Sequence, residues 1–153
     1  MRLWHKKLIG CLPRQQLIGQ WRELNAMYKQ LQSKGKVTHR LVSYLNDDLE
    51  SFWKYSRLVL MEMFVRGYKT KDCEFKSIIL KRTSLKDDFT KTFKEHNDKY
   101  LMQCISNLEE KHDRGIIEDF EWENIMKHTR DLIKQYGKNL FKEYLQTHEI
   151  ILK

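Results

Sequence analysis

The stretch that decides the fold is residues 13–33, with the sequence PRQQLIGQWRELNAMYKQLQS. Its large apolar side chains recur at alternating spacings of four and three residues, at Leu17, Trp21, Leu24, Tyr28 and Leu31. This spacing places them on one face of an α-helix. Pro13 suits the first turn of such a helix, and Gly35 stands where a left-handed residue commonly ends one. We therefore expect an amphipathic helix over about 13–33 that buries one side.

The rest of the chain is expected to be helical as well, because one proline and six glycines in 153 residues interrupt it rarely. The first ten residues are expected to be extended, and a helical turn or two is expected at 38–45. Residues 68–84 are ambiguous, and 73–80 could be a strand or irregular. Further helices are expected at 49–66, 85–93, 97–111, 116–135 and 138–145. The sequence thus predicts an all-α, compact single domain over residues 1–153, with about five to six helices and an extended N-terminal segment.

Several classes of protein do not fit this sequence. No apolar run approaches the ~20 residues needed to cross a bilayer. Only Leu8 and Ile9 follow the basic opening before Gly10, which is too short for a signal peptide. The three cysteines (Cys11, Cys73 and Cys104) are odd in number and far apart, so they predict neither a disulfide framework nor a zinc-binding pair. We expect a cytoplasmic, reduced protein that is a monomer.

The net charge of +8 lies entirely in the first third of the chain. Residues 46–153 carry equal numbers of basic and acidic side chains. Residues 1–45 carry one acid, Glu23, against nine basic residues, which are Arg2, Lys6, Lys7, Arg14, Arg22, Lys29, Lys34, Lys36 and Arg40. A one-sided block of this kind favours a polyanionic partner. Nucleic acid fits better than an acidic protein or a membrane surface, because no long helix with one apolar and one basic face is present.

Two residues of the 13–33 helix are candidates for chemistry, although each also has an ordinary explanation. Glu23 lies at the edge of the apolar stripe beside Gln16 and Gln20, where a sheltered carboxylate could serve proton transfer, or it is simply a solvated helix residue. Arg14 and Gln15 stand in the first turn, where acids are usual, so free N–H groups and an arginine could bind phosphate. An arginine merely exposed to water explains the second pattern equally well.

Other motifs are absent or weak. The six histidines have no metal-ligand spacing, and there is no Gly-rich phosphate loop and no nucleophile elbow. Asp47 and Asp48 with Glu74 and Lys76 faintly resemble a metal-dependent nuclease, but that arrangement needs strands. We therefore expect no metal and no cofactor.

Four blocks of sequence together resemble a known family. They are MRLWHKKLI at 1–9, LPRQQLIGQWREL at 12–24, EMFVRGY at 62–68 and EHNDKYLMQCISNLEEK at 95–111. Their order and spacing resemble the pyrimidine-dimer DNA glycosylases, relatives of phage endonuclease V. The resemblance covers about residues 1–113. Residues 114–153 are an unmatched C-terminal extension that is expected to be helical.

The resemblance implies a cofactor-independent DNA-repair enzyme with two linked activities. It would cut the glycosidic bond of a UV-induced pyrimidine dimer and then break the strand at the abasic site by β-elimination. The family's nucleophile is its own terminal α-amine, which forms an imine with the sugar. Here that amine corresponds to Met1, which we expect to be retained because aminopeptidases require a small second residue. The assisting glutamate of the family corresponds to Glu23.

The chemistry agrees with the absence of cofactor motifs. A terminal α-amine ordinarily has a pKa of about 8, against about 10.4 for lysine, so part of it is a neutral nucleophile at cellular pH. Imine formation needs no metal. The residues expected to bind double-stranded DNA are Arg2, His5, Lys6, Lys7, Arg14, Gln15 and Arg22. The alternative is a non-catalytic duplex DNA-binding protein on the same scaffold, followed by a metal-dependent nuclease.

Overall fold

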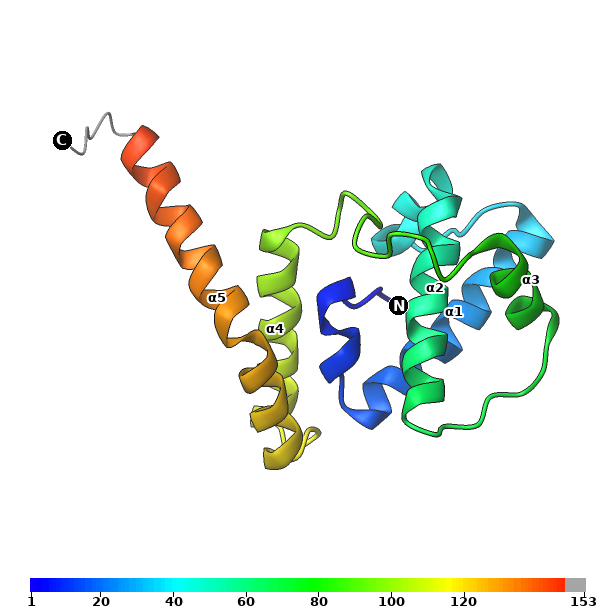
Figure 1. The fold of residues 1–153 in the computed structure, drawn as a ribbon, viewed down its shortest axis with the longest axis horizontal. Helices are drawn as coiled ribbons and strands as arrows, with labels where there is room; N and C mark the ends of the chain where they lie inside the picture. Colours follow the sequence, from blue (N-terminus) through cyan, green and yellow to red (C-terminus); the bar gives the residue numbers. More distant parts are fainter. Residues whose placement is uncertain (148–153) are drawn as a thin grey trace. The chain divides into compact units, whose positions relative to one another are not determined.

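The computed structural model of the protein describes residues 1–147, without the side chains of 144, 145 and 147. It is all-helical, as the sequence predicts, and the described residues contain no strand (Figure 1). The helical segments are η1 (Lys6–Cys11), α1 (Arg14–Lys34), η2 (Arg40–Asp47), α2 (Leu49–Val65), α3 (Glu74–Arg82), α4 (Asp98–Asp113) and α5 (Asp119–Thr147), where η marks a 3₁₀-helix. The chain divides into two compact units, residues 1–104 and 105–153. The prediction of a single domain stays a prediction.

Helix α1 is the amphipathic helix predicted from the spacing of its apolar residues. Leu17, Trp21, Leu24 and Tyr28 are buried, and Leu31 is half-buried. Pro13 precedes the helix, and Gly35 follows it with φ of +73°. The N–H of this left-handed glycine donates to the carbonyl of Leu31, which satisfies one of the last carbonyls of the helix.

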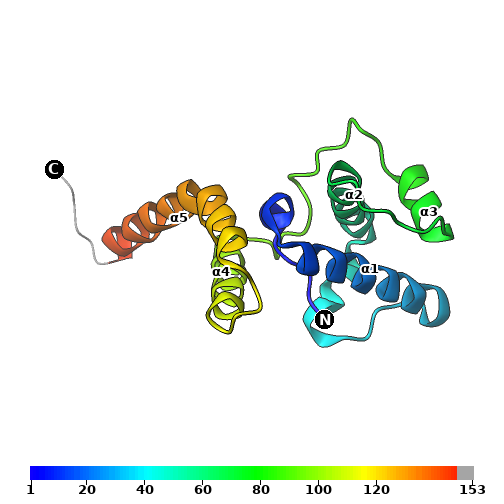
Figure 2. The same ribbon diagram turned by 90° about the horizontal axis from the view of Figure 1, so that it is seen from below.

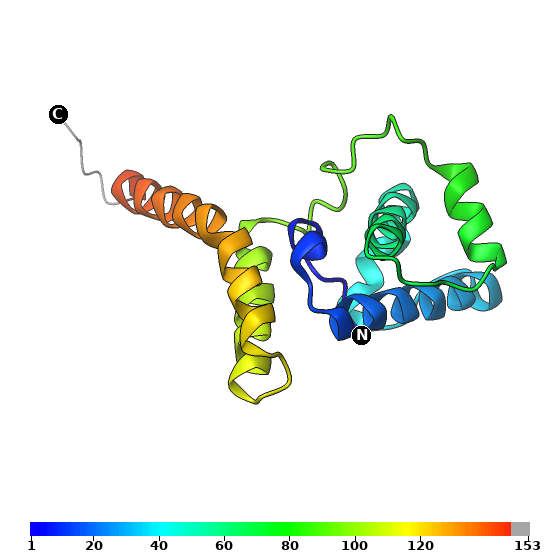
Figure 3. The same cartoon turned by 60° about the horizontal axis from the view of Figure 1, so that its bottom comes forward.

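Helix α2 is the central element of the first unit, since η1, η2, α1 and α3 all pack against it (Figure 3). Between these helices lies an aromatic cluster built around Phe75 of α3. The Phe75 ring stacks on Tyr28 at 4.8 Å, on Trp21 at 5.4 Å and on Phe52 at 6.0 Å between ring centroids. These three partners come from α1 and α2, so Phe75 joins three helices.

The first segment is extended only as far as His5. The prediction of ten extended residues is therefore wrong for η1, which turns directly into α1 (Figure 2). The His5 ring accepts a hydrogen bond from the Lys7 N–H at 3.1 Å and so caps the short helix. At the C-terminal end of η1, the Arg66 guanidinium donates to the carbonyl of Leu12 at 2.7 Å.

Two further expectations in the first unit are wrong. Residues 74–82 form a helix rather than a strand or an irregular segment, because Phe75 and Ile79, four residues apart, are both buried in the core. Residues 85–93 form turns rather than a helix. The carboxylates of Asp87 and Asp88 accept from the N–H groups of Ser84 and Thr90, and such local bonds compete with a helix.

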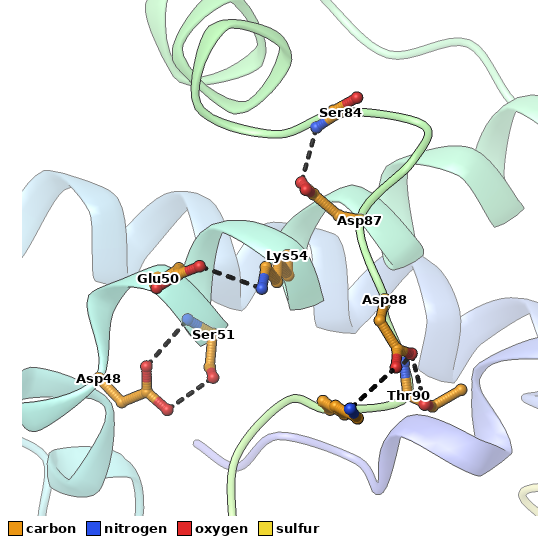
Figure 4. A network of polar contacts seen from close by, with 9 residues as sticks. Asp48, Glu50, Ser51, Lys54, Ser84, Asp87, Asp88 and Thr90 are labelled. Atoms are coloured by element: carbon orange, nitrogen blue, oxygen red, sulfur yellow. Dashed lines mark hydrogen bonds and ion pairs between the residues drawn. The ribbon is translucent and has the colours of Figure 1, made fainter.

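The start of α2 faces this turn-rich loop (Figure 4). Asp48 caps the helix by accepting from the Ser51 N–H at 3.1 Å, as expected for an aspartate at this position. One turn further on, Lys54 pairs with Glu50 at 3.1 Å. Caps of this kind contribute about 1 kcal/mol each to helix stability.

The second unit contains the end of α4 and the whole of α5. Gly115, with φ of +75°, ends α4, and the His112 ring stacks on Trp122 and contacts the Asp119 carboxylate at 2.7 Å. The two helices expected at 116–135 and 138–145 are one continuous helix, so that prediction is wrong. Gly137 lies within it, since a single glycine costs a helix only about 1 kcal/mol. The last six residues of the extension lie outside the described part of the chain.

Candidate active site

The first five residues are held to the helices by their main-chain atoms. The Gln20 side chain bonds to two of these residues: its oxygen accepts from the Trp4 N–H at 2.7 Å, and its nitrogen donates to the Arg2 carbonyl at 3.1 Å. Gln20 is 1 % exposed although it is polar. A buried amide costs stability unless it is paired, so this pairing stabilises one position of the segment.

Two tyrosines hold the same segment from other helices. The Tyr55 hydroxyl, from α2, donates to the Trp4 carbonyl at 2.6 Å and lies 3.0 Å from the Gln20 oxygen. The Tyr100 hydroxyl, from α4, donates to the Leu3 carbonyl. Burial raises the pKa of both hydroxyls above the usual value, so both stay protonated and remain donors.

Glu23 lies beside the start of this fixed segment. Its Oε2 accepts from the Arg2 main-chain N–H at 3.2 Å, and its side chain is half-buried. The Met1 α-nitrogen is three covalent bonds from this amide nitrogen, so it lies within about 4 Å of it in any conformation. The Arg2 guanidinium stacks over the Trp4 ring at 5.5 Å. The arrangement therefore brings a carboxylate, a guanidinium and the chain's first nitrogen together.

Two buried, neutral histidines, His5 and His96, contact each other within the core, at the end of this segment. The rings of His5 and His96 stack with their centroids 5.3 Å apart. His5 Nδ1 accepts from the Lys7 N–H and His96 Nδ1 accepts from the Lys6 N–H, so each ring carries its proton on Nε2. These Nε2 atoms lie 2.8 Å from the His96 carbonyl and 3.1 Å from the Tyr44 hydroxyl. Burial lowers the pKa of His5 to about 4 and that of His96 to about 3.

The residues expected to bind DNA fall into two groups. His5 is 1 % exposed and hydrogen-bonded, so its position fits support of the segment better than contact with DNA. Lys6 is half-buried, and its ammonium donates to the Thr92 carbonyl at 2.8 Å. The exposed group consists of Lys7, Arg14, Gln15 and Arg22. Their contacts with DNA stay predictions.

Arg14 has a neighbour that its sequence position did not suggest. Its guanidinium lies 5.5 Å from the centre of the Tyr68 ring. Tyr68 belongs to the EMFVRGY block, so this contact links two of the blocks that carry the family resemblance. A guanidinium stacked on an aromatic ring keeps its edge free for phosphate oxygens.

The sequence missed four residues that position the segment: Gln20, Tyr55, His96 and Tyr100. A signal existed only for Gln20, which is an amide on the apolar face of α1, one turn before Glu23. The partners at 96 and 100 lie more than 90 residues from the segment. No local pattern connects residues that far apart.

The two buried cysteines do not form a second reactive centre. Cys11 and Cys104 are buried, and burial raises the pKa of the Cys11 thiol to about 12 and raises that of Cys104. Neither thiol is therefore activated as a nucleophile. Among residues 1–147, no group of three or more metal-ligating side chains could hold a metal ion. Within the same range, no helix combines the length and apolar character that crossing a bilayer requires.

Comparison with known proteins finds a family match in the N-terminal part of the chain. Residues 1–75 match the family model described as pyrimidine dimer DNA glycosylase, which confirms the resemblance of the sequence blocks in this part. The match contains the whole of α1 and α2, including Gln20, Glu23 and Tyr55. The resemblance at 95–111 lies outside it and stays a prediction. No curated protein and no solved structure was found to match the chain.

Proposed function

Since residues 1–75 match the pyrimidine dimer DNA glycosylases, we propose that this protein is a DNA-repair glycosylase that also cleaves the strand at the abasic site it creates. One observation carries the proposal. The Glu23 carboxylate lies 3.2 Å from the main-chain nitrogen of Arg2, the residue that follows Met1. A free terminal amine and a carboxylate are the two groups that this chemistry requires.

In the proposed first step, the neutral α-amine of Met1 attacks the sugar C1′. A bond forms between the amine nitrogen and C1′, and the base leaves with the electron pair of the glycosidic bond. The nitrogen then loses a proton to the Glu23 carboxylate. Opening of the sugar ring gives an imine as the C1′–oxygen bond breaks, and the ring oxygen takes the proton from Glu23. Loss of the C2′ proton and departure of the 3′ phosphate complete β-elimination.

Removal of Met1 would change the nucleophile but not the site. The Arg2 nitrogen would then be the α-amine, at the position that already lies 3.2 Å from Glu23. The large Arg2 side chain favours retention of Met1, which is why we assign the nucleophile to Met1. Intact mass distinguishes the two forms, and peptide mapping of a trapped adduct identifies the modified residue.

DNA would be held by exposed cations outside the buried segment. Arg14, Gln15 and Arg22 project from α1, which also carries Glu23. Contacts with phosphates would offset the cost of bending the duplex or extruding a nucleotide. Lys7 is exposed next to the fixed segment and would add to this surface.

Borohydride trapping tests the proposal. The protein is incubated with a UV-irradiated duplex and with a duplex that contains an abasic site, and borohydride then reduces any imine to a stable covalent adduct. We expect an adduct with both substrates and none after selective acylation of the α-amine. Duplex binding without an adduct on either substrate would support the non-catalytic DNA-binding alternative instead.

A further inference from the structure

A cavity lies in the first unit, between α2 and α3. It has a volume of about 290 Å³, and its walls include Leu60, Met61, Phe64 and Leu80 together with Arg57. Phe64 is 82 % exposed and Leu80 is 55 % exposed, so the apolar wall is open to solvent. A small apolar cavity that contains a charged group is a common form of ligand site.

The cation in this cavity is buried and has no acidic partner. Arg57 is 8 % exposed. Its Nη1 donates to the hydroxyl of Thr83 at 2.8 Å and to the Thr83 carbonyl at 3.2 Å. Among the residues that the structure describes, Nε has no hydrogen-bond partner and no carboxylate forms an ion pair with this guanidinium. A buried charge without a counter-charge is costly, so Arg57 favours an anion from outside the chain.

Lys76, the other cation of the cavity wall, does have an acidic partner. Lys76 pairs with Asp72 at 3.0 Å. Because Nη1 of Arg57 is engaged by Thr83 and Nε is buried, Nη2 is the guanidinium nitrogen that remains for a ligand. Its N–H groups can donate charge-assisted hydrogen bonds to a carboxylate oxygen.

We propose that this cavity binds a small organic carboxylate, with its charged end at Nη2 of Arg57 and its apolar body against Leu60, Phe64 and Leu80. The apolar walls disfavour a bare, strongly hydrated phosphate. The volume lies at the lower end of ligand pockets, which corresponds to a body of about eight carbon atoms. The proposal does not depend on glycosylase activity, because it concerns different residues and is tested by binding.

Calorimetric titration of the full-length protein with octanoate tests this inference. We expect a dissociation constant below about 1 mM. Octan-1-ol, which has the apolar body without the charge, is expected to bind at least tenfold more weakly, as is inorganic phosphate, which has the charge without the body. Equal binding of octanol or of phosphate would overturn the proposal.

A variant that supplies the missing acid gives a second test that does not remove Arg57. Leu80→Glu places a carboxylate in the same cavity on a largely exposed position, so it is expected to abolish octanoate binding and to raise the melting temperature. Leu80→Gln lacks the charge and is expected to lower affinity without raising the melting temperature. Leu85→Glu, at an exposed leucine outside the cavity, should change neither. Unchanged octanoate binding in Leu80→Glu would contradict the assignment.

Discussion

The two faces of α1 differ in what they contact. One face carries Gln20 and Glu23, which bond to the main chain of residues 2–4 and are buried or half-buried. The other carries Arg22 and Lys29, which are exposed, while Arg14 and Gln15 stand exposed in its first turn. The first face is bonded to the start of the chain, and the second would offer charge to the DNA of the proposed function. One helix thus has one face that positions the start of the chain and another that is proposed to attract DNA.

Substitutions on the two faces should therefore change different measured quantities. A change on the buried face should reduce the chemical step and leave duplex affinity nearly unchanged. A change on the exposed face should alter affinity and its salt dependence and leave the chemical step nearly unchanged. The predictions below test this division, beginning with the largest expected effect.

Glu23→Gln should give the largest loss, because it removes the carboxylate and keeps the size of the side chain. We expect the rate of base release and of adduct formation to fall about 10²–10⁴-fold, the usual contribution of acid–base catalysis. Single-turnover kinetics on a UV-irradiated duplex measure this loss. Glu109→Gln, at an exposed position of α4, is the matched control and should keep the rate. If Glu23→Gln lowered duplex affinity by as large a factor as the rate, the two faces of α1 would not have separate roles.

Gln20→Leu should come next, since it leaves the Trp4 N–H and the Arg2 carbonyl without their partner. An unpaired buried polar group costs about 1–3 kcal/mol, which urea unfolding measures. We expect adduct formation to slow about tenfold beyond the change in stability, because small displacements of reacting atoms reduce rates strongly. Gln16→Leu makes the same chemical change one turn earlier and should have the smaller effect on both quantities. Equal effects of the two variants would remove Gln20 from a positioning role.

The buried histidine pair should make the protein sensitive to acid. Their pKa values, about 4 for His5 and about 3 for His96, lie below the unfolded value of about 6.5, so the unfolded state binds more protons at pH 4–6. This contribution to stability is therefore present above pH 6.5 and is lost as the pH falls. Between pH 6 and pH 5 the loss should be about 2 kcal/mol for the two rings together.

Urea unfolding at a series of pH values measures the acid effect. His96→Asn shortens the ring to an amide and should flatten the dependence between pH 6 and pH 5. His39→Asn changes the half-buried histidine that precedes η2, so it should leave the slope in place. A slope that His96→Asn does not reduce would show that other groups cause it.

Arg22→Ala should have the smallest effect and should act on binding alone. If Arg22 contacts one phosphate, the slope of log affinity against log salt should fall by about 0.9. Fluorescence anisotropy at several salt concentrations measures that slope. Lys127→Ala, which removes one exposed charge from α5, controls for net charge and should leave the slope nearly unchanged. A large loss of catalysis with unchanged affinity would place Arg22 in the chemical step instead.

Sequence patterns predicted the parts of the fold that depend on neighbouring residues. The four-and-three spacing in α1 is a local signal, and the helix that it predicts was confirmed. At residues 73–80 the sequence allowed a strand or irregular structure, and both alternatives were wrong, because burial of Phe75 and Ile79 against α1 and α2 decides that segment. The break expected near Gly137 was wrong as well, since one glycine does not interrupt a helix by itself.

The candidate site was also predictable only in the part that a local feature of the sequence marks. Glu23 is distinctive in sequence as the one acid in the first 45 residues, and the family resemblance gave it a role. The hydroxyls of Tyr55 and Tyr100 and the His96 ring could not be linked to the first residues, because their separations of 51, 97 and 90 residues leave no periodic trace. The burial of His5 depends on the same distant partners.

The bonds from Tyr100 and His96 to the first residues also set an order of events during synthesis. The start of the chain emerges from the ribosome first, yet two of its anchors are made more than 90 residues later. At a translation rate of roughly 5–20 residues per second, this delay lasts about 5–20 seconds. Until then the first residues can be bonded only by the earlier partners Gln20, Glu23 and Tyr55. If Met1 carries the nucleophile, as we propose, acetylation of its amine in this interval would remove the nucleophile before the segment is fully held.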